Sequence, residues 1–138
     1  MKYVLAEEYD YDFKLIGISC HAKDYRLAWA INKSLGFRME KEEFDLDILS
    51  DNPLERSVHP VFSFFDEEEQ NEYFLICNRV GGGYLIPEQR HADFVFMIKE
   101  SFPVDIKEMI VNLRKIELVL TAFEIEVGKL KSKKNLIF

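Results

Sequence analysis

The sequence predicts an α+β domain, with a mainly antiparallel sheet of five to seven strands and two helices. Short apolar runs rich in β-branched and aromatic residues recur along the chain, separated by turn-forming residues, and such runs are typical of strands. Residues 22–35 and 104–115 instead repeat apolar side chains at helical spacing. A chain of 138 residues is long enough for one domain with one full core, so we expect a single domain over 1–138.

Composition and charge exclude several classes of protein. Apolar residues make up 48% and charged residues 31%, which excludes a disordered chain, and no apolar run is long enough to cross a membrane. The N-terminus lacks a signal-peptide pattern, and Cys20 and Cys77 lie inside apolar runs, so we expect buried thiols and a cytoplasmic protein. The net charge of -7 argues against binding to duplex nucleic acid.

The first half of the chain predicts one interior strand and one two-faced helix. Residues 13–20 are apolar on both faces, which favours a strand inside the sheet. Residues 22–35 form the first helix, and Gly36 stands where a left-handed C-cap residue is expected. Its apolar stripe is formed by Leu27, Ile31 and Leu35, and the opposite side carries Tyr25, Trp29 and Asn32.

The middle of the chain, residues 73–99, is expected to form the centre of the sheet. Residues 1–11 predict an edge strand or a loose arm, and residues 50–53 predict a turn. Gly81–Gly83 is read as a tight turn and not as a phosphate-binding loop, because no Lys-Ser/Thr pair follows it. Strands are predicted near residues 37–44, 60–65, 73–80, 84–86 and 93–98.

The second helix is predicted to begin near Val104, with Ser101 as a possible cap. Its end has two interpretations. Either the helix stops near Lys115 and a strand follows over residues 118–125, which we favour, or a heptad pattern continues the helix to Gly128. The basic tail, residues 129–138, ends in Leu-Ile-Phe and is expected to dock on the domain.

One motif resembles a known family. The motif consists of Ile86-Pro87-Glu88, three further residues, and Ala92-Asp93-Phe94. It is similar to the signature of the bacterial IPExxxVDY family, and residues 15–32 and 129–138 are also similar to that family's pattern. Ala92 stands in place of Val and Phe94 in place of Tyr, so any role of a phenolic hydroxyl is lost here. The resemblance implies no activity, because none is established for the family.

The motif has a structural and a functional interpretation. Pro87 stiffens the corner, and the Glu88 carboxylate is expected to clamp it by accepting hydrogen bonds from backbone amides or by pairing with Arg26 or Arg79. Alternatively, the Glu88 carboxylate binds a ligand or acts in catalysis. Glu88, His91 and Asp93 are metal-capable residue types, and Cys20 with His21 could suggest a nucleophile, but neither pattern is specific. We therefore expect no metal, no cofactor and no catalytic constellation.

The candidate contact surface is formed by Tyr25, Arg26 and Trp29, which have the composition of interface hot spots. The Arg26 guanidinium could stack on the indole. The plainer alternative is that Trp29 is tucked into the domain.

Three functional interpretations follow from these patterns. The first is a non-enzymatic protein-binding or regulatory domain, with a homodimer as one form. The second is a small-molecule binder or small enzyme with a pocket near Glu88 and Asp93. The third and weakest is RNA contact through the tail lysines 129, 131, 133 and 134.

Overall fold

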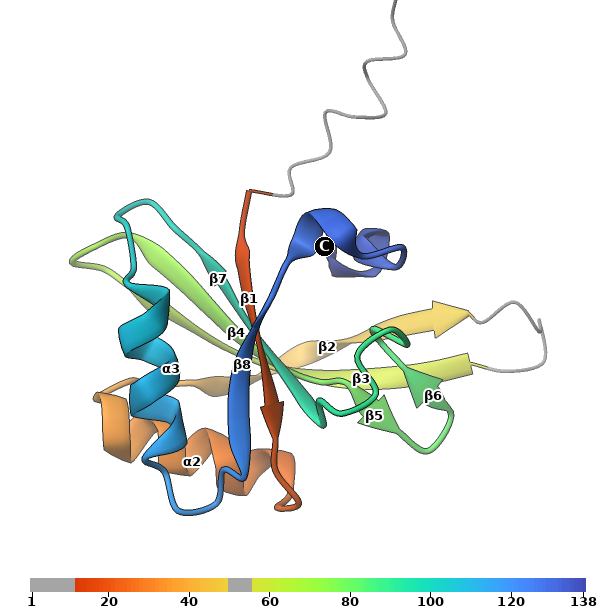
Figure 1. The fold of residues 1–138 in the computed structure, drawn as a ribbon, viewed down its shortest axis with the longest axis horizontal. Helices are drawn as coiled ribbons and strands as arrows, with labels where there is room; N and C mark the ends of the chain where they lie inside the picture. The colour runs from red at the N-terminus through yellow and green to blue at the C-terminus, as the bar shows by residue number, and fades with distance from the viewer. Residues whose placement is uncertain (1–11, 50–55) are drawn as a thin grey trace, which may run out of the picture.

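The predicted α+β fold is present in the computed structural model, which describes residues 12–49 and 56–138 (Figure 1). Within these residues, a six-stranded antiparallel sheet has the order β2-β3-β4-β7-β1-β8, and β5 and β6 form a small second sheet. The arm or edge strand predicted for residues 1–11 and the turn predicted for 50–53 lie outside the described residues. The elements are β1 (Lys14–Ser19), α2 (Asp24–Leu35), β2 (Glu40–Leu49), β3 (Arg56–Asp66), β4 (Asn71–Cys77), β5 (Arg79–Val80), β6 (Gly83–Tyr84), β7 (Phe94–Lys99), α3 (Ile106–Arg114) and β8 (Thr121–Ile125).

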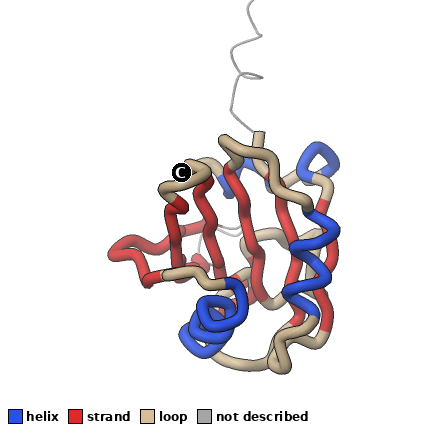
Figure 2. The backbone as a smooth tube through the Cα atoms, turned by 90° about the vertical axis from the view of Figure 1, so that its left-hand side faces the viewer, coloured by secondary structure: helices blue, strands red, loops and turns tan. Residues whose placement is uncertain are grey.

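Both helices cover the same face of the sheet (Figure 2). Alternate side chains of the central strands point to this face, among them Ile16 and Ile18 of β1 and Phe96 of β7, because side chains alternate along a strand. Helix α2 packs on them through the predicted Leu27 and Ile31 and through Ala28, which are buried, while the third predicted stripe residue, Leu35, is partly buried against the same core. The helix ends at Leu35, and the left-handed φ of 72° at the following Gly36 confirms the predicted C-cap.

A C-terminal strap, residues 127–138, covers the other face of the sheet together with the loop that follows β6. Leu130 and Leu136 of the strap are buried in this second core, with Leu85 and Ile86 of the loop. The strap contains two short 3-10 turns, Val127–Lys129 and Lys133–Leu136. The prediction that the tail docks on the domain is therefore confirmed.

Several predicted boundaries were wrong. Strand β2 runs to Leu49 instead of turning to loop near residue 44, because Leu46 and Ile48 pack on the second core while the alternating Asp45 and Asp47 are exposed. Helix α3 begins at Ile106 and is capped by the Asp105 side chain, which accepts a hydrogen bond from the Glu108 N–H; Ser101 is not the cap. The helix ends at Arg114 and β8 follows, as favoured over the long heptad helix.

The strand predicted over residues 73–80 is interrupted before the glycine turn that follows it. Strand β4 ends at Cys77, three residues before the predicted end, and Arg79–Val80 pairs instead with Gly83–Tyr84 across the turn. A Cβ atom at Gly82 would collide with the backbone oxygen of Arg56 in β3. The turn therefore needs glycine there because two backbones approach closely, as expected of a structural turn.

Candidate functional site

The motif residues lie in a loop, residues 85–93, that is built around the buried side chain of Asn78. The Asn78 Nδ2 group donates to the backbone oxygens of Gln89 at 2.9 Å and Ala92 at 2.8 Å. The Ile86 N–H donates to Asn78 Oδ1 at 2.7 Å. One amide side chain thus satisfies three backbone groups of the loop, and it holds both ends of the motif.

Asp93 joins this loop to the segment between β1 and α2. Its carboxylate accepts a hydrogen bond from the Cys20 N–H at 2.8 Å and forms an ion pair with Arg79 at 2.7 Å. Its backbone N–H donates to the Ile18 oxygen at 2.9 Å. The next residue, Phe94, is buried in the core beneath the helices. Asp93 and Phe94 therefore both have structural contacts.

Glu88 clamps the C-terminal strap. Its carboxylate accepts hydrogen bonds from the N–H of Lys131, from the N–H of Ser132 at 3.0 Å and from the Ser132 hydroxyl at 2.6 Å. Burial alone would raise the pKa of Glu88, but these hydrogen bonds outweigh it and lower the pKa. Glu88 accepts hydrogen bonds from backbone amides as expected, but these amides belong to the strap and not to the corner that the prediction named. The expected arginine partners were wrong, because Arg79 pairs with Asp93.

The metal-capable and nucleophilic residue types do not form a reactive site. In the part of the chain that the structure describes, no group of three His, Cys, Asp or Glu side chains could hold a metal ion. Burial raises the pKa of Cys20, and burial together with the Asp24 carboxylate raises the pKa of Cys77 to about 12. Both thiols therefore stay protonated at neutral pH, and a thiol is a weak nucleophile. They line a cavity of about 340 Å³ that includes Asp93 but not Glu88.

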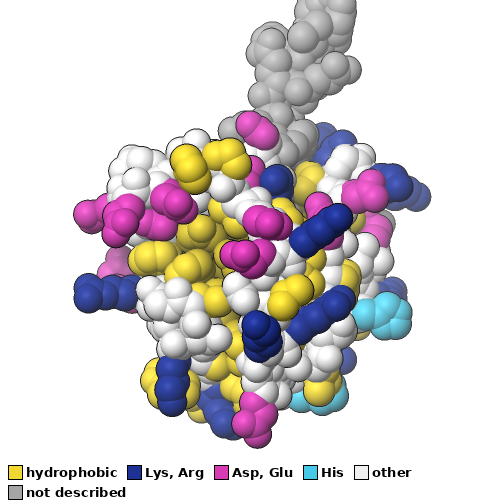
Figure 3. Space-filling view, turned by 60° about the vertical axis from the view of Figure 1, so that its left-hand side comes forward, with side chains coloured by type: hydrophobic (Ala, Val, Ile, Leu, Met, Phe, Trp, Pro, Cys, Tyr) yellow, Lys and Arg dark blue, Asp and Glu magenta, His cyan; other side chains and the backbone are white. Residues whose placement is uncertain are grey.

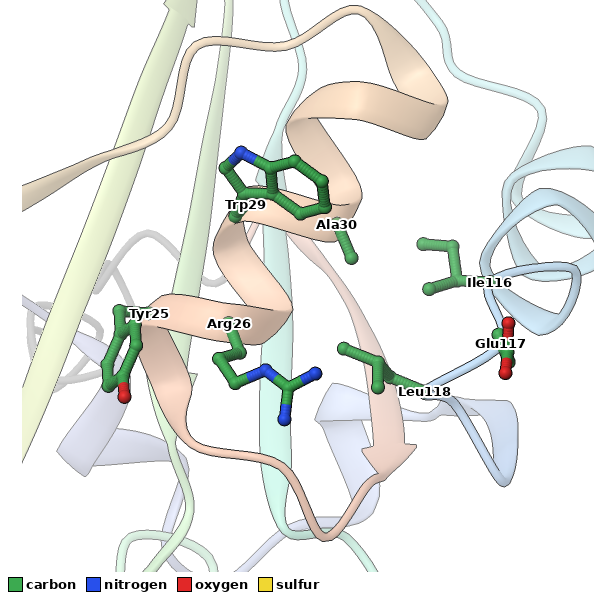
Figure 4. A pocket seen from close by; sticks show the side chains of 7 residues that line it. All are labelled: Tyr25, Arg26, Trp29, Ala30, Ile116, Glu117 and Leu118. Atoms are coloured by element: carbon green, nitrogen blue, oxygen red, sulfur yellow. The ribbon is translucent and has the colours of Figure 1, made fainter.

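The predicted contact residues form one wall of an open groove between helix α2 and the segment that connects α3 to β8 (Figure 4). We call this surface the α2 groove; its volume is about 600 Å³ and most of its lining is apolar. The side chains of Trp29 and Tyr25 are 63% and 59% exposed, so the alternative of a tucked-in Trp29 was wrong. The lining residues are Tyr25, Arg26, Trp29, Ala30, Ile116, Glu117 and Leu118.

Charge in the α2 groove is divided between its two walls. Arg26 belongs to the helix wall, and its guanidinium points across toward Leu118 (Figure 4). Glu117 belongs to the opposite wall. The cation over the indole of Trp29 is Lys33, whose Nζ lies 5.1 Å from the ring centroid, so the predicted stacking of Arg26 was wrong.

Sequence reasoning missed two parts of these sites. Asn78 falls inside the strand predicted over residues 73–80, although a single amide within this apolar run is a signal of a break. The groove wall of Ile116, Glu117 and Leu118 had no such signal, because its position opposite α2 depends on how the two helices pack.

Comparison with protein-family models, with curated proteins and with solved structures finds no match to this chain. Among the described helices, none is long and apolar enough to cross a membrane. The geometry of the described residues is therefore the basis for a functional proposal.

Proposed function

We propose that this chain is a non-enzymatic protein-binding domain, with a regulatory role, whose contact surface is the α2 groove. The observation that carries the proposal is the exposed indole of Trp29 at the edge of an apolar groove. Tryptophan, tyrosine and arginine are the residues most enriched at the centres of protein interfaces, and Tyr25 and Arg26 stand on the same helix turn. Covering the exposed indole would remove a large apolar area from water.

The lining of the groove defines the chemistry of the partner. An apolar side chain of the partner would fill the space between Ala30, Ile116 and Leu118. An acidic group beside it would face Arg26, and a basic group would face Glu117. The partner is therefore a protein surface with a central apolar side chain and one charge of each sign next to it.

The small-molecule alternative near Glu88 and Asp93 has less support. Both carboxylates accept hydrogen bonds from the chain itself, and Asp93 is also paired with Arg79, so neither is poised for a ligand. RNA contact through the strap lysines is supported by charge alone. A cytoplasmic location agrees with the free thiols of Cys20 and Cys77. The motif at residues 86–94 supports membership of the bacterial IPExxxVDY family.

Site-specific photo-crosslinking in cells tests the proposal. A benzoylphenylalanine in place of Tyr25 should give a discrete protein adduct, identified by mass spectrometry, because the side chain lies in the groove. The same probe at Phe65, an exposed position on β3 outside the groove, is the control and should give none.

The substitution Trp29→Ala measures the same contact quantitatively. It should weaken binding of the identified partner by about 2 kcal/mol or more, which is the range of an interface hot spot. Phe102→Ala removes an exposed aromatic ring outside the groove and should leave the affinity unchanged. The proposal is wrong if position 25 gives no protein adduct, or if Trp29→Ala binds as tightly as the unaltered chain.

A further inference from the structure

We propose that the partner of the α2 groove is a second copy of this chain, docked groove to groove about a two-fold axis. This inference rests on the proposed function, and it names the partner. A two-fold interface uses the same patch on both copies, so that residue i of one contacts residue j of the other and the reverse. A surface suited to this arrangement must contain both halves of each contact.

The α2 groove contains both halves of the charged contact. Arg26 stands on the helix wall and Glu117 on the opposite wall, and neither forms an ion pair with another described residue. When two such grooves face each other about a two-fold axis, Arg26 of each copy meets Glu117 of the other. The interface would then hold two identical ion pairs, with no like charges opposed in the groove.

The groove also contains both halves of the apolar contact. Trp29 projects from the helix wall and is largely exposed, while Ala30, Ile116 and Leu118 line the space beside it. A groove of about 600 Å³ has room for a side chain from the facing copy. The side of the molecule that carries the helices exposes apolar side chains among positive and negative ones (Figure 3). This side is therefore not covered by charges of one sign, which would repel a second copy.

Charge reversal separates this arrangement from any other contact. Arg26→Glu alone and Glu117→Arg alone each place like charges opposite one another twice, and each should raise the dimer dissociation constant at least about tenfold. The double variant R26E/E117R restores both pairs and should return the constant to within about threefold of the original. Sedimentation equilibrium measures all three, with circular dichroism and thermal unfolding as checks that each variant folds.

A mixture of the two single variants gives a second and stricter measurement. In a mixed pair, each contact between positions 26 and 117 again joins opposite charges, so the mixture should dimerise at least about tenfold more tightly than either variant does alone. This result requires a reciprocal contact and cannot come from a change in the stability of either chain. Lys107→Glu reverses an exposed charge on α3 outside the groove and should leave dimerisation unchanged.

The outcomes distinguish this inference from the proposed function. A chain that is monomeric by sedimentation, yet gives an adduct with a different protein from position 25, refutes the second copy and leaves a protein-binding groove. A monomer that gives no adduct refutes both. A dimer in which neither the double variant nor the mixture recovers affinity refutes the two-fold pairing of Arg26 with Glu117.

Discussion

Replacing Asn78 with alanine should destabilise the domain by about 3 kcal/mol. The substitution removes three hydrogen bonds between the buried side chain and the motif loop. The Gln89 oxygen keeps the Ala92 N–H as a partner at 3.1 Å, but the Ile86 N–H and the Ala92 oxygen lose the partner that they have in the folded protein. A buried polar group left without a partner costs about 1–3 kcal/mol, and two such groups give the expected total.

Urea unfolding followed by circular dichroism measures this change as a difference in the free energy of unfolding. Asn78→Asp is the matched variant, because the carboxylate still accepts from the Ile86 N–H but has no amide protons to donate. It should destabilise the domain at least as much as alanine does, since it also buries a charge. Asn112→Ala, on helix α3, is the control and should change the free energy by less than about 0.5 kcal/mol.

A loss below about 1 kcal/mol for Asn78→Ala would refute this reasoning. It would mean that the loop backbone finds other partners and that the motif does not depend on the amide. In that case the buried Ile86 and Ala92 would hold the loop by packing alone, and the structural interpretation of the motif would lose its main support.

Three further predictions concern the strap, the buried histidine and the thiols. Glu88→Gln weakens the charge-assisted clamp, so hydrogen exchange of the Lys131 and Ser132 amides should become at least about tenfold faster; unchanged protection contradicts the clamp. Burial lowers the pKa of His59, whose Nδ1–H donates to the Cys77 oxygen at 2.7 Å, so the unfolded chain binds more protons below about pH 6.5. The free energy of unfolding should therefore fall as the pH decreases below that value, and His59→Gln should remove this part of the slope. Cys77 is only partly buried, contrary to the expected buried thiol, but its pKa is raised to about 12. It should therefore resist iodoacetamide at pH 8 in the folded protein and react readily in urea; rapid modification of the folded protein contradicts the raised pKa.

Much of the fold could be predicted because it depends on local patterns. The apolar face of α2 and the glycine after it depend only on residues close together in the sequence, and the structure contains both. The boundaries that were wrong depend on contacts across the sheet. β2 continues to Leu49 because its partner strand β3 offers hydrogen bonds as far as Arg56, and a charged edge strand looks like a loop in sequence.

Only the helix wall of the α2 groove could be predicted from the sequence. Tyr25 and Trp29 could be assigned to the outer face of a helix from spacing alone, but spacing does not say whether another element covers that face. The answer depends on where α3 and the segment after it lie, and they stop short of the indole. The expected Arg26 stack failed for a similar reason, since Lys33 one turn further along reaches the ring instead.

The motif loop and the α2 groove, which contain the candidate residues of the sequence, have different roles in the structure. In the motif, the Asn78 amide and the carboxylates of Glu88 and Asp93 make their hydrogen bonds within the chain, so substitutions there should act on stability. In the α2 groove the large aromatic side chains are exposed, and α2 is held to the sheet by the other side of the helix. Trp29→Ala should therefore change the free energy of unfolding by less than about 0.5 kcal/mol while it weakens association. If Trp29→Ala instead unfolded the domain as readily as Asn78→Ala, the indole would belong to the core and the groove would have no separate role in binding.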